Sequence, residues 1–202
     1  MIAVVDYGMG NLRSVEKAFE HVGATVAVTN DAARVHLASG VVLPGVGAFP
    51  KAMERIRALG LDQLVHDRVA AGVPVLGICL GLQLLFESSS ELGGAEGLGV
   101  IGGNVERLPA NGLKLPQIGW NAVTWTQPAS PLLDGLPDPC AMYHVHTYAP
   151  RTPEALGVAT YGEEFVSAVE HGTVYGVQFH PEKSGRHGLR LLENFVRICA
   201  AA

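Results

Sequence analysis

The sequence predicts an α/β fold with a central, mostly parallel sheet, helices on both of its faces and a smaller antiparallel part. In the N-terminal half, short apolar segments of strand type alternate with segments whose apolar residues recur at helical spacing. The strand-like segments are apolar throughout, which is typical of strands that are buried on both faces. After about residue 88 the chain is richer in glycine, proline and alternating polar residues, which is typical of antiparallel strands.

Strands and helices of the N-terminal half can be placed in order. Asn11 is a suitable N-cap for the first helix, which carries apolar residues from Leu12 to Val22 at helical spacing. Pro50 suits the first turn of a second helix, and residues 61–69 carry another amphipathic stripe. A helix from Leu80 to about Phe86 follows the last strand directly. The strands themselves are expected at residues 2–6, 24–28, 41–43 and 73–78.

The C-terminal half is predicted to contain more strands and one closing helix. Strands are expected at residues 100–108, 122–126, 166–170 and 173–180. The last of these reads as a buried strand that returns to the core. Apolar residues from Leu189 to Cys199 then recur on one face of a helix, which predicts that Cys199 is a core residue.

Composition limits the class of protein. The chain has 202 residues, 48% hydrophobic and 16% charged, and no linker divides it, so one domain over residues 1–202 is expected. A net charge of −5 without a basic cluster disfavours a nucleic-acid or membrane partner. Residues 70–86 are apolar but too interrupted to span a bilayer. With no signal peptide and no disulfide framework among three cysteines, a cytoplasmic location is expected.

Cys79 lies between two glycines where the last apolar strand of the N-terminal half meets a helix. The pattern Gly77-x-Cys79-x-Gly81 is typical of a nucleophile elbow, a tight turn whose glycines let neighbouring backbone pass closely. The following helix favours a thiolate, and the Leu80 N–H would point toward a developing oxyanion. The alternative is a buried structural cysteine. A nucleophile also needs a base and a residue that orients the base.

His180 and Glu182, in the segment QFHPEKS, are the candidates for these two roles. His180 ends an apolar strand, so its side chain is expected at the same carboxyl edge of the sheet as Cys79. Glu182 follows two residues later, a spacing that returns both side chains to one side of extended backbone. His180 could accept the thiol proton while Glu182 fixes the imidazole tautomer. The alternative is a chance HPE sequence in a solvated loop.

The other histidines and cysteines fit no metal site. His144 and His146 form an H-x-H pair, but no third ligand at a matching spacing accompanies them. No two cysteines have the spacing of a zinc ligand set, so neither a metal nor a cofactor is expected. Four histidines in or beside polar stretches are expected at the surface: His21, His36, His66 and His171.

Together the elbow and the distal HPE resemble the class I, or triad, glutamine amidotransferases, and the resemblance covers essentially the whole chain. It implies the three-layer, flavodoxin-like fold of that family. It also implies that L-glutamine is hydrolysed: the cysteine attacks the side-chain amide, ammonia leaves, and water hydrolyses the glutamyl thioester. The segment LPGVGAF resembles the family loop beside the oxyanion site, which implies that Val46 and Gly47 provide a second backbone donor together with Leu80. Further positions match the family residues that contact substrate glutamine: Gln83, Tyr143, Thr147 and Tyr148.

Two segments, DYGMGNLRSV (residues 6–15) and PQIGWN (residues 116–121), resemble more narrowly the glutaminase subunits of imidazole glycerol phosphate synthase. The resemblance implies a heterodimer with a (β/α)8-barrel cyclase. That cyclase uses the ammonia in histidine biosynthesis and releases imidazole glycerol phosphate and an aminoimidazole carboxamide ribotide. Three alternatives stay open: a triad glutaminase for pyridoxal phosphate, GMP or anthranilate synthesis, a stand-alone γ-glutamyl hydrolase, or a catalytically silent interaction module.

The segment PQIGWN is expected to be a loop that exposes a tryptophan. Aromatic anchors of this kind are typical of protein interfaces, although Trp120 could instead fold back onto the core. The carboxyl edge of the sheet, where Cys79 and His180 are expected, is the natural docking face. The sequence therefore predicts Asn11, Trp120 and Asn121 as partner-interface residues.

Overall fold

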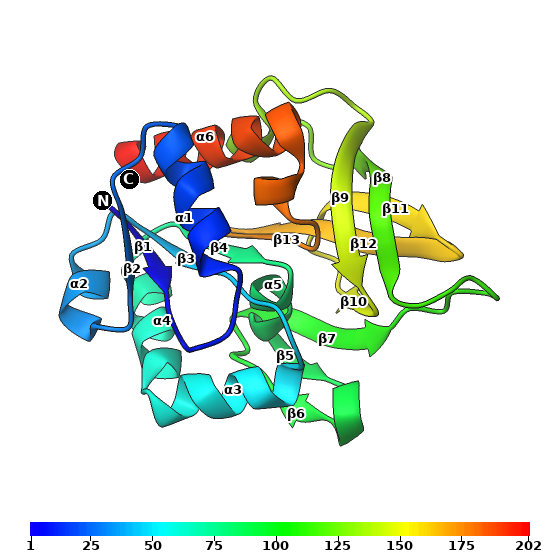
Figure 1. Cartoon of the computed structure of the whole chain (residues 1–202), viewed down its shortest axis with the longest axis horizontal. Helices are drawn as coiled ribbons and strands as arrows, with labels where there is room; N and C mark the ends of the chain where they lie inside the picture. The colour runs from blue at the N-terminus through cyan, green and yellow to red at the C-terminus, as the bar shows by residue number, and fades with distance from the viewer.

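Figure 1 shows a computed structural model that describes residues 1–202, with a nine-stranded sheet through the middle of the molecule. One half of this sheet is parallel, in the order β2-β1-β3-β4-β13. All residues of four of these strands are buried, as expected for a sheet covered on both faces. The five strands are β1 (Ile2–Val5), β2 (Val26–Thr29), β3 (Gly40–Leu43), β4 (Val75–Ile78) and β13 (Val174–Val177).

The other half of the large sheet is antiparallel and continues from β13 in the order β12-β11-β8-β9. Its strands are β8 (Gln117–Trp125), β9 (Cys140–His146), β11 (Ala155–Tyr161) and β12 (Glu163–His171). A second sheet of four strands, in the order β10-β7-β5-β6, lies beside it. It contains β5 (Phe86–Ser89), β6 (Ala95–Glu96), β7 (Ile101–Arg107) and β10 (Tyr148–Arg151).

Helices cover both faces of the large sheet, so the predicted α/β class is confirmed (Figure 1). The antiparallel part is larger than expected, because it takes up half of this sheet. On one face lie α1 (Leu12–His21) and α6 (Gly185–Ala201). On the other face lie α2 (Ala32–His36), α3 (Phe49–Ala58), α4 (Leu61–Ala70) and α5 (Leu80–Leu84). Three single 3-10 turns complete the chain: η1 (Glu91–Gly93), η2 (Pro131–Leu133) and η3 (Pro181–Lys183).

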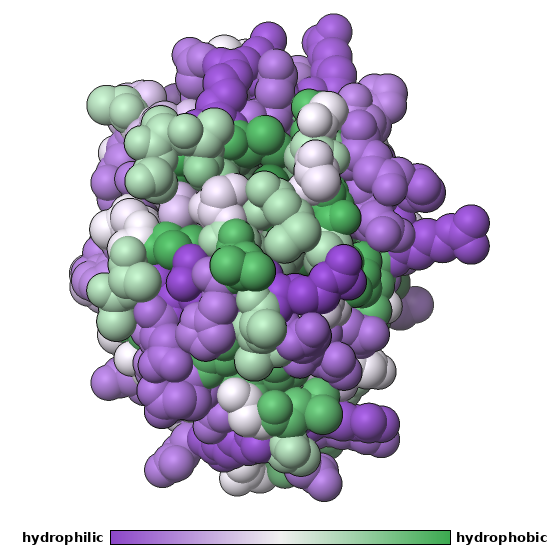
Figure 2. Space-filling view, turned by 90° about the vertical axis from the view of Figure 1, so that its left-hand side faces the viewer, coloured by the Kyte–Doolittle hydropathy of each residue, from purple (hydrophilic) through white to green (hydrophobic).

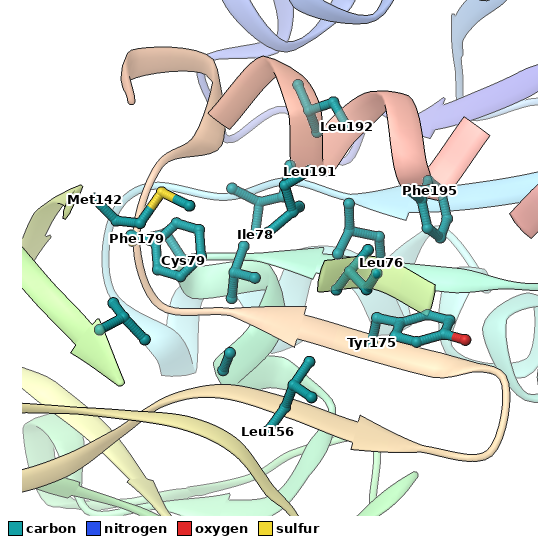
Figure 3. Packing of buried hydrophobic residues seen from close by; sticks show 14 of the residues in the cluster. Leu76, Ile78, Cys79, Met142, Leu156, Tyr175, Phe179, Leu191, Leu192 and Phe195 are labelled. Carbon is teal, nitrogen blue, oxygen red and sulfur yellow. The ribbon is translucent and has the colours of Figure 1, made fainter. Parts of the chain in front are cut away.

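The C-terminal helix α6 covers the core behind the predicted site. Figure 3 shows Leu191, Leu192 and Phe195 of this helix packed over Leu76 and Ile78 of β4, and Phe179 near Met142. Burial of these side chains holds β4 and β13 side by side with their carboxyl ends together. The prediction that Cys199 is a core residue is confirmed, because it is buried in the same cluster.

The surface beyond the β2 edge, near both chain ends, carries hydrophobic areas that are interrupted by hydrophilic ones (Figure 2). On the far side of the molecule, the β8–β9 hairpin carries two large apolar side chains that are mostly exposed, Ile118 at 63% and Trp120 at 59%. None of the helices combines the length and the apolar character needed to cross a bilayer.

The expectation that PQIGWN is a loop is wrong. Residues 117–121 are the first part of strand β8, which pairs with β9 from Gln117 to Val123. Side chains alternate between the two faces, and Ile118 and Trp120 point outward while Gln117 and Val123 are buried. The apolar character of the outward positions hides the alternation, so the sequence predicted a strand only from Ala122.

The helix after Cys79 is shorter than expected. It ends at Leu84, and Phe86 already belongs to strand β5, because the apolar run continues into a second buried element. Asn11 does stand at the N-cap position of α1, but its side chain makes no capping hydrogen bond. Pro50 lies in the first turn of α3, as predicted.

Candidate active site

The turn from β4 into α5 has the strained geometry of an elbow. Cys79 adopts φ 54° and ψ −110°, a left-handed backbone conformation that is unfavourable for a residue with a side chain. A Cβ atom at Gly77 would lie 2.7 Å from the Cα of Leu82, and one at Gly81 would overlap the carbonyl oxygen of Leu43. Only glycine fits at both positions, so the expected reason for the G-x-C-x-G pattern is confirmed.

The sulfur of Cys79 lies in a mostly buried position with polar neighbours. Its thiol donates to the carbonyl oxygen of Val145 at 3.7 Å, and Nε2 of Gln178 donates to the sulfur at 3.7 Å. The burial pattern alone would fit a structural cysteine, but these polar contacts and the strained backbone do not.

His180 and Glu182 form a buried hydrogen-bonded pair. Nδ1 of His180 lies 2.8 Å from Oε1 of Glu182, and both side chains are buried. The backbone of His180 is held as well, because its N–H donates to the carbonyl of Tyr143 and its own carbonyl accepts from the hydroxyl of Ser184. The imidazole is therefore held in one orientation, with Nδ1 directed to the carboxylate.

Two opposing effects set the protonation of His180. Burial lowers its pKa, but hydrogen bonds and negative charge from Cys79 and Glu182 outweigh burial and raise the pKa to about 9. Oε2 of Glu182 is buried without a hydrogen-bond partner, so the carboxylate depends on the imidazolium for compensation. A protonated His180 beside the sulfur would stabilise a thiolate, the form in which a cysteine is nucleophilic.

This arrangement predicts an alkaline limit to activity. Because the pKa of His180 is raised to about 9, the imidazolium keeps its proton below that pH and loses it above, so kcat/KM for glutamine should fall with a midpoint near pH 9. Glu182→Gln removes the negative charge and should move this midpoint to lower pH. A pH profile of both proteins checks it, and an unchanged midpoint in the variant would show that Glu182 does not support the imidazolium.

The loop between β3 and α3, residues 44–48, packs directly against the elbow. A Cβ atom at Gly45 would lie 2.9 Å from Cβ of Leu80, so glycine is needed for this close approach. The hydroxyl of Tyr7 donates to the carbonyl of Pro44 at 2.6 Å, and a carboxylate oxygen of Glu91 accepts from the N–H of Phe49 at 2.8 Å. Both ends of the loop are therefore anchored by buried or half-buried side chains.

A cavity of about 260 Å³ opens above Cys79 and His180. Six of the residues predicted beside the oxyanion and the substrate line it: Val46, Gly47, Leu80, Gln83, Thr147 and Tyr148. Tyr143 does not line this cavity. The sequence reasoning missed five further lining residues: Glu91, Pro116, Val145, His146 and Lys183. The sequence could have suggested Lys183 as a lining residue, because it directly follows the predicted HPE segment.

Gln83 connects the cavity wall to the segment after β9. Its Nε2 donates to the carbonyl of Tyr148 at 3.0 Å, and the carbonyl of Thr147 accepts from the N–H of Leu108 at 2.9 Å. The backbone carbonyl groups of Thr147 and Tyr148 therefore both accept hydrogen bonds within the protein. Tyr143 lies on the outward face of the hairpin, where its ring packs edge-to-face with Trp120 at a centroid distance of 6.0 Å.

Among the partner-interface candidates, Trp120 does not fold back onto the core, so that alternative is wrong. Nδ2 of Asn121 donates to the carbonyl of Thr160 at 2.9 Å, which ties β8 to the end of β11. Asn11 is half-buried at the start of α1, next to a loop that packs against Gly45. The three residues therefore have different surroundings, and only Trp120 presents a large exposed surface.

The ring nitrogens of the H-x-H pair all have hydrogen-bond partners within the protein. His144 hydrogen-bonds to the carbonyl of Met142 and to the hydroxyl of Ser167, and His146 to the carbonyl of Tyr148 and the amide of Gln117. Burial lowers the pKa of His144 to about 3 and that of His146 to about 4, so both stay neutral. The four histidines expected at the surface are exposed.

The other two cysteines differ chemically from Cys79. Burial, with the nearby charge of Asp138, raises the pKa of Cys140 to about 11, and burial raises that of Cys199 to about 12. Both remain protonated thiols at neutral pH, and neither lies in an elbow. All three cysteines are free.

Comparison with known proteins defines the class to which this fold and site belong. The family model "Glutamine amidotransferase class-I" matches residues 3–199. The glutaminase domain of Trypanosoma brucei CTPS shares the fold with a TM-score of 0.71 at 18% identity, covering 99% of this chain and 93% of that chain. PurLQS from Thermotoga maritima does so with a TM-score of 0.73 at 16% identity, covering 98% and 97%.

Similar sequences narrow the class further. The imidazole glycerol phosphate synthase subunit HisH of Symbiobacterium thermophilum is 52% identical over 98% of this chain and 93% of the relative. The corresponding HisH subunit of Moorella thermoacetica is 49% identical over 96% of this chain and 93% of the relative. The chain belongs to the HisH family of class I glutamine amidotransferases.

Proposed function

We propose that this chain hydrolyses L-glutamine to glutamate and ammonia through a thioester on Cys79, and that it passes the ammonia to a cyclase subunit in histidine biosynthesis. Membership of the HisH family supports the overall reaction. The observation that carries the residue assignment is the convergence of Cys79 with the buried His180–Glu182 pair, from segments about a hundred residues apart, at one cavity.

The first half of the reaction releases ammonia. The thiolate of Cys79 attacks the side-chain carbonyl carbon of glutamine, a C–S bond forms, and the carbonyl electron pair moves to oxygen. The N–H of Leu80 and a backbone donor from Val46 or Gly47 stabilise this oxyanion. When the oxyanion collapses, the C–N bond breaks and the proton of His180 passes to the departing nitrogen.

The second half regenerates the cysteine. His180, now neutral, accepts a proton from a water molecule that attacks the glutamyl thioester, and a second oxyanion forms in the same place. Its collapse breaks the C–S bond and releases glutamate. Glu182 holds the imidazole in the tautomer that these proton transfers need, and compensates its positive charge.

Steady-state glutamate release distinguishes this function from a stand-alone hydrolase. The chain is assayed with L-glutamine alone and again with a purified (β/α)8-barrel cyclase and its ribonucleotide substrate. We expect slow hydrolysis by the isolated chain and a large increase, coupled to formation of imidazole glycerol phosphate, in the mixture. Equal rates with and without the cyclase would contradict the coupled function.

The outward face of the β8–β9 hairpin is the proposed docking surface for the cyclase. Ile118 and Trp120 on β8 stand opposite Val145 and Tyr143 on β9, and all four side chains lie on the same face. Val145 also lines the cavity, and the carbonyl of Tyr143 accepts from the N–H of His180. A partner seated on this face would therefore lie next to the site. Asn11 and Asn121 are further proposed contacts, although Asn121 lies on the opposite face of β8 from Trp120.

Replacing the exposed tryptophan should weaken the complex without harming the fold. Because Trp120 is 59% exposed, Trp120→Ala removes little buried area from the isolated chain. A tryptophan buried in an interface contributes about 2 kcal/mol or more to binding, so the dissociation constant for the cyclase should rise at least about thirtyfold. Titration calorimetry measures the affinity and urea unfolding the stability. A destabilised chain with unchanged affinity would place the docking face elsewhere.

A further inference from the structure

Gln178 is a buried side chain that the steps above leave without a role. It precedes His180 by two residues, and the side chains of both residues contact Cys79. Gln178 is completely buried and does not line the cavity. Its Nε2 nevertheless donates to the sulfur of Cys79 at 3.7 Å.

Neighbouring groups determine which end of this amide faces the sulfur. Nε2 of Gln83 donates to the carbonyl of Tyr148 at 3.0 Å and to Oε1 of Gln178, also at 3.0 Å. Because Oε1 of Gln178 is engaged as an acceptor, its Nε2 is the end directed at Cys79. A buried chain of hydrogen bonds therefore runs from the Tyr148 backbone through two glutamines to the sulfur.

The charge state of the sulfur makes this donor important. The thiol of Cys79 can donate to the carbonyl of Val145, but a thiolate has no proton to donate and is repelled by the same carbonyl oxygen. An N–H group that donates to the sulfur favours the thiolate over the thiol, because a hydrogen bond to a charged acceptor is stronger than one to a neutral acceptor. The side-chain amide of Gln178 provides this N–H donor to the sulfur of Cys79.

We infer that Gln178 is a further catalytic residue, whose amide N–H stabilises the thiolate of Cys79 when the thiol loses its proton and again when the sulfur leaves the glutamyl group. This inference rests on the proposed role of Cys79 as nucleophile. It assigns to Gln83 a second task, which is to hold the amide of Gln178 in this orientation.

The test is the pH dependence of alkylation in the full chain. Iodoacetamide modification of each cysteine is followed by peptide mass spectrometry, without glutamine present. Methionine is similar in size to glutamine but has no hydrogen-bond donor. In Gln178→Met the pH midpoint for alkylation of Cys79 should therefore rise by about one pH unit or more. With the cyclase present, kcat should fall about tenfold or more while KM changes less, because this side chain does not line the cavity.

Two further variants serve as a second test and as a control. Gln178→Glu keeps an acceptor for Gln83 and the same shape but places a carboxylate at the sulfur, so its midpoint should rise further than that of Gln178→Met. Gln117→Met removes another buried amide, one that contacts His146 and not the sulfur, and should leave the midpoint at its native value.

Native midpoints and native kcat in folded Gln178→Met or Gln178→Glu would overturn the inference while leaving the proposed function intact. If Cys79 of the native chain reacts no faster than Cys140 and Cys199, the proposed function and the inference both fail.

Discussion

Cys79→Ala should abolish glutamine hydrolysis while the complex with the cyclase still forms. Loss of a nucleophile in a triad costs about 10⁴-fold or more in kcat, since no other group can form the covalent intermediate. The backbone conformation at residue 79 is as strained for alanine as it is for cysteine. The substitution therefore leaves this strain unchanged, and the fold should be retained. Ammonia supplied at high concentration should still support the cyclase reaction.

The control for this variant is Cys140→Ala, which removes a buried thiol outside the cavity. It should lower the free energy of unfolding slightly and leave glutamine-dependent product formation in place. Measurable glutamine turnover by purified Cys79→Ala, above that of a mock preparation, would assign the nucleophile to another residue.

Gly81→Ala should disable the site through the backbone. The added methyl group would overlap the carbonyl oxygen of Leu43, so either β3 or the elbow must move. Overpacking of this kind costs about 1–3 kcal/mol, and displacement of the nucleophile by about 1 Å can reduce activity about a hundredfold. Urea unfolding and kcat with the cyclase check the two effects.

Gly102→Ala is the matched control, because a Cβ atom at Gly102 meets no atom within 4 Å. It should change stability by less than about 1 kcal/mol and leave kcat unaltered. If Gly81→Ala has native stability and kcat, the close approach of the Leu43 carbonyl to the elbow is not a real constraint on the sequence.

The elbow and the distal histidine could be predicted because their chemistry fixes residue types at short spacings. Gly77, Cys79 and Gly81 are required within five residues by one tight turn, and the structure shows which backbone atoms impose it. His180 and Glu182 are two residues apart and form the expected pair, but Glu182 lies in the 3-10 turn η3 and not in the extended backbone that the prediction assumed. Their meeting with Cys79 followed from the rule that parallel strands share a carboxyl edge.

Other parts of the site leave no comparable signal in the sequence. Gln178 and Glu91 act through hydrogen bonds to groups far away along the chain, and one glutamine or glutamate looks like any other. The first half of β8 was missed because Ile118 and Trp120 are apolar on the exposed face. Apolar side chains on the exposed face disguise the alternation by which a strand is recognised.

The most direct test of the central claim, that Cys79 is the activated nucleophile of a glutaminase, is the site of reaction with a glutamine analogue carrying an electrophile at its γ position. The native complex is incubated with a small excess, and its cysteine peptides are analysed by mass spectrometry. We expect one adduct per chain, on Cys79, prevented by excess glutamine and absent from His180→Ala at neutral pH. Adducts distributed over Cys79, Cys140 and Cys199, or found on either of the last two alone, would contradict the account.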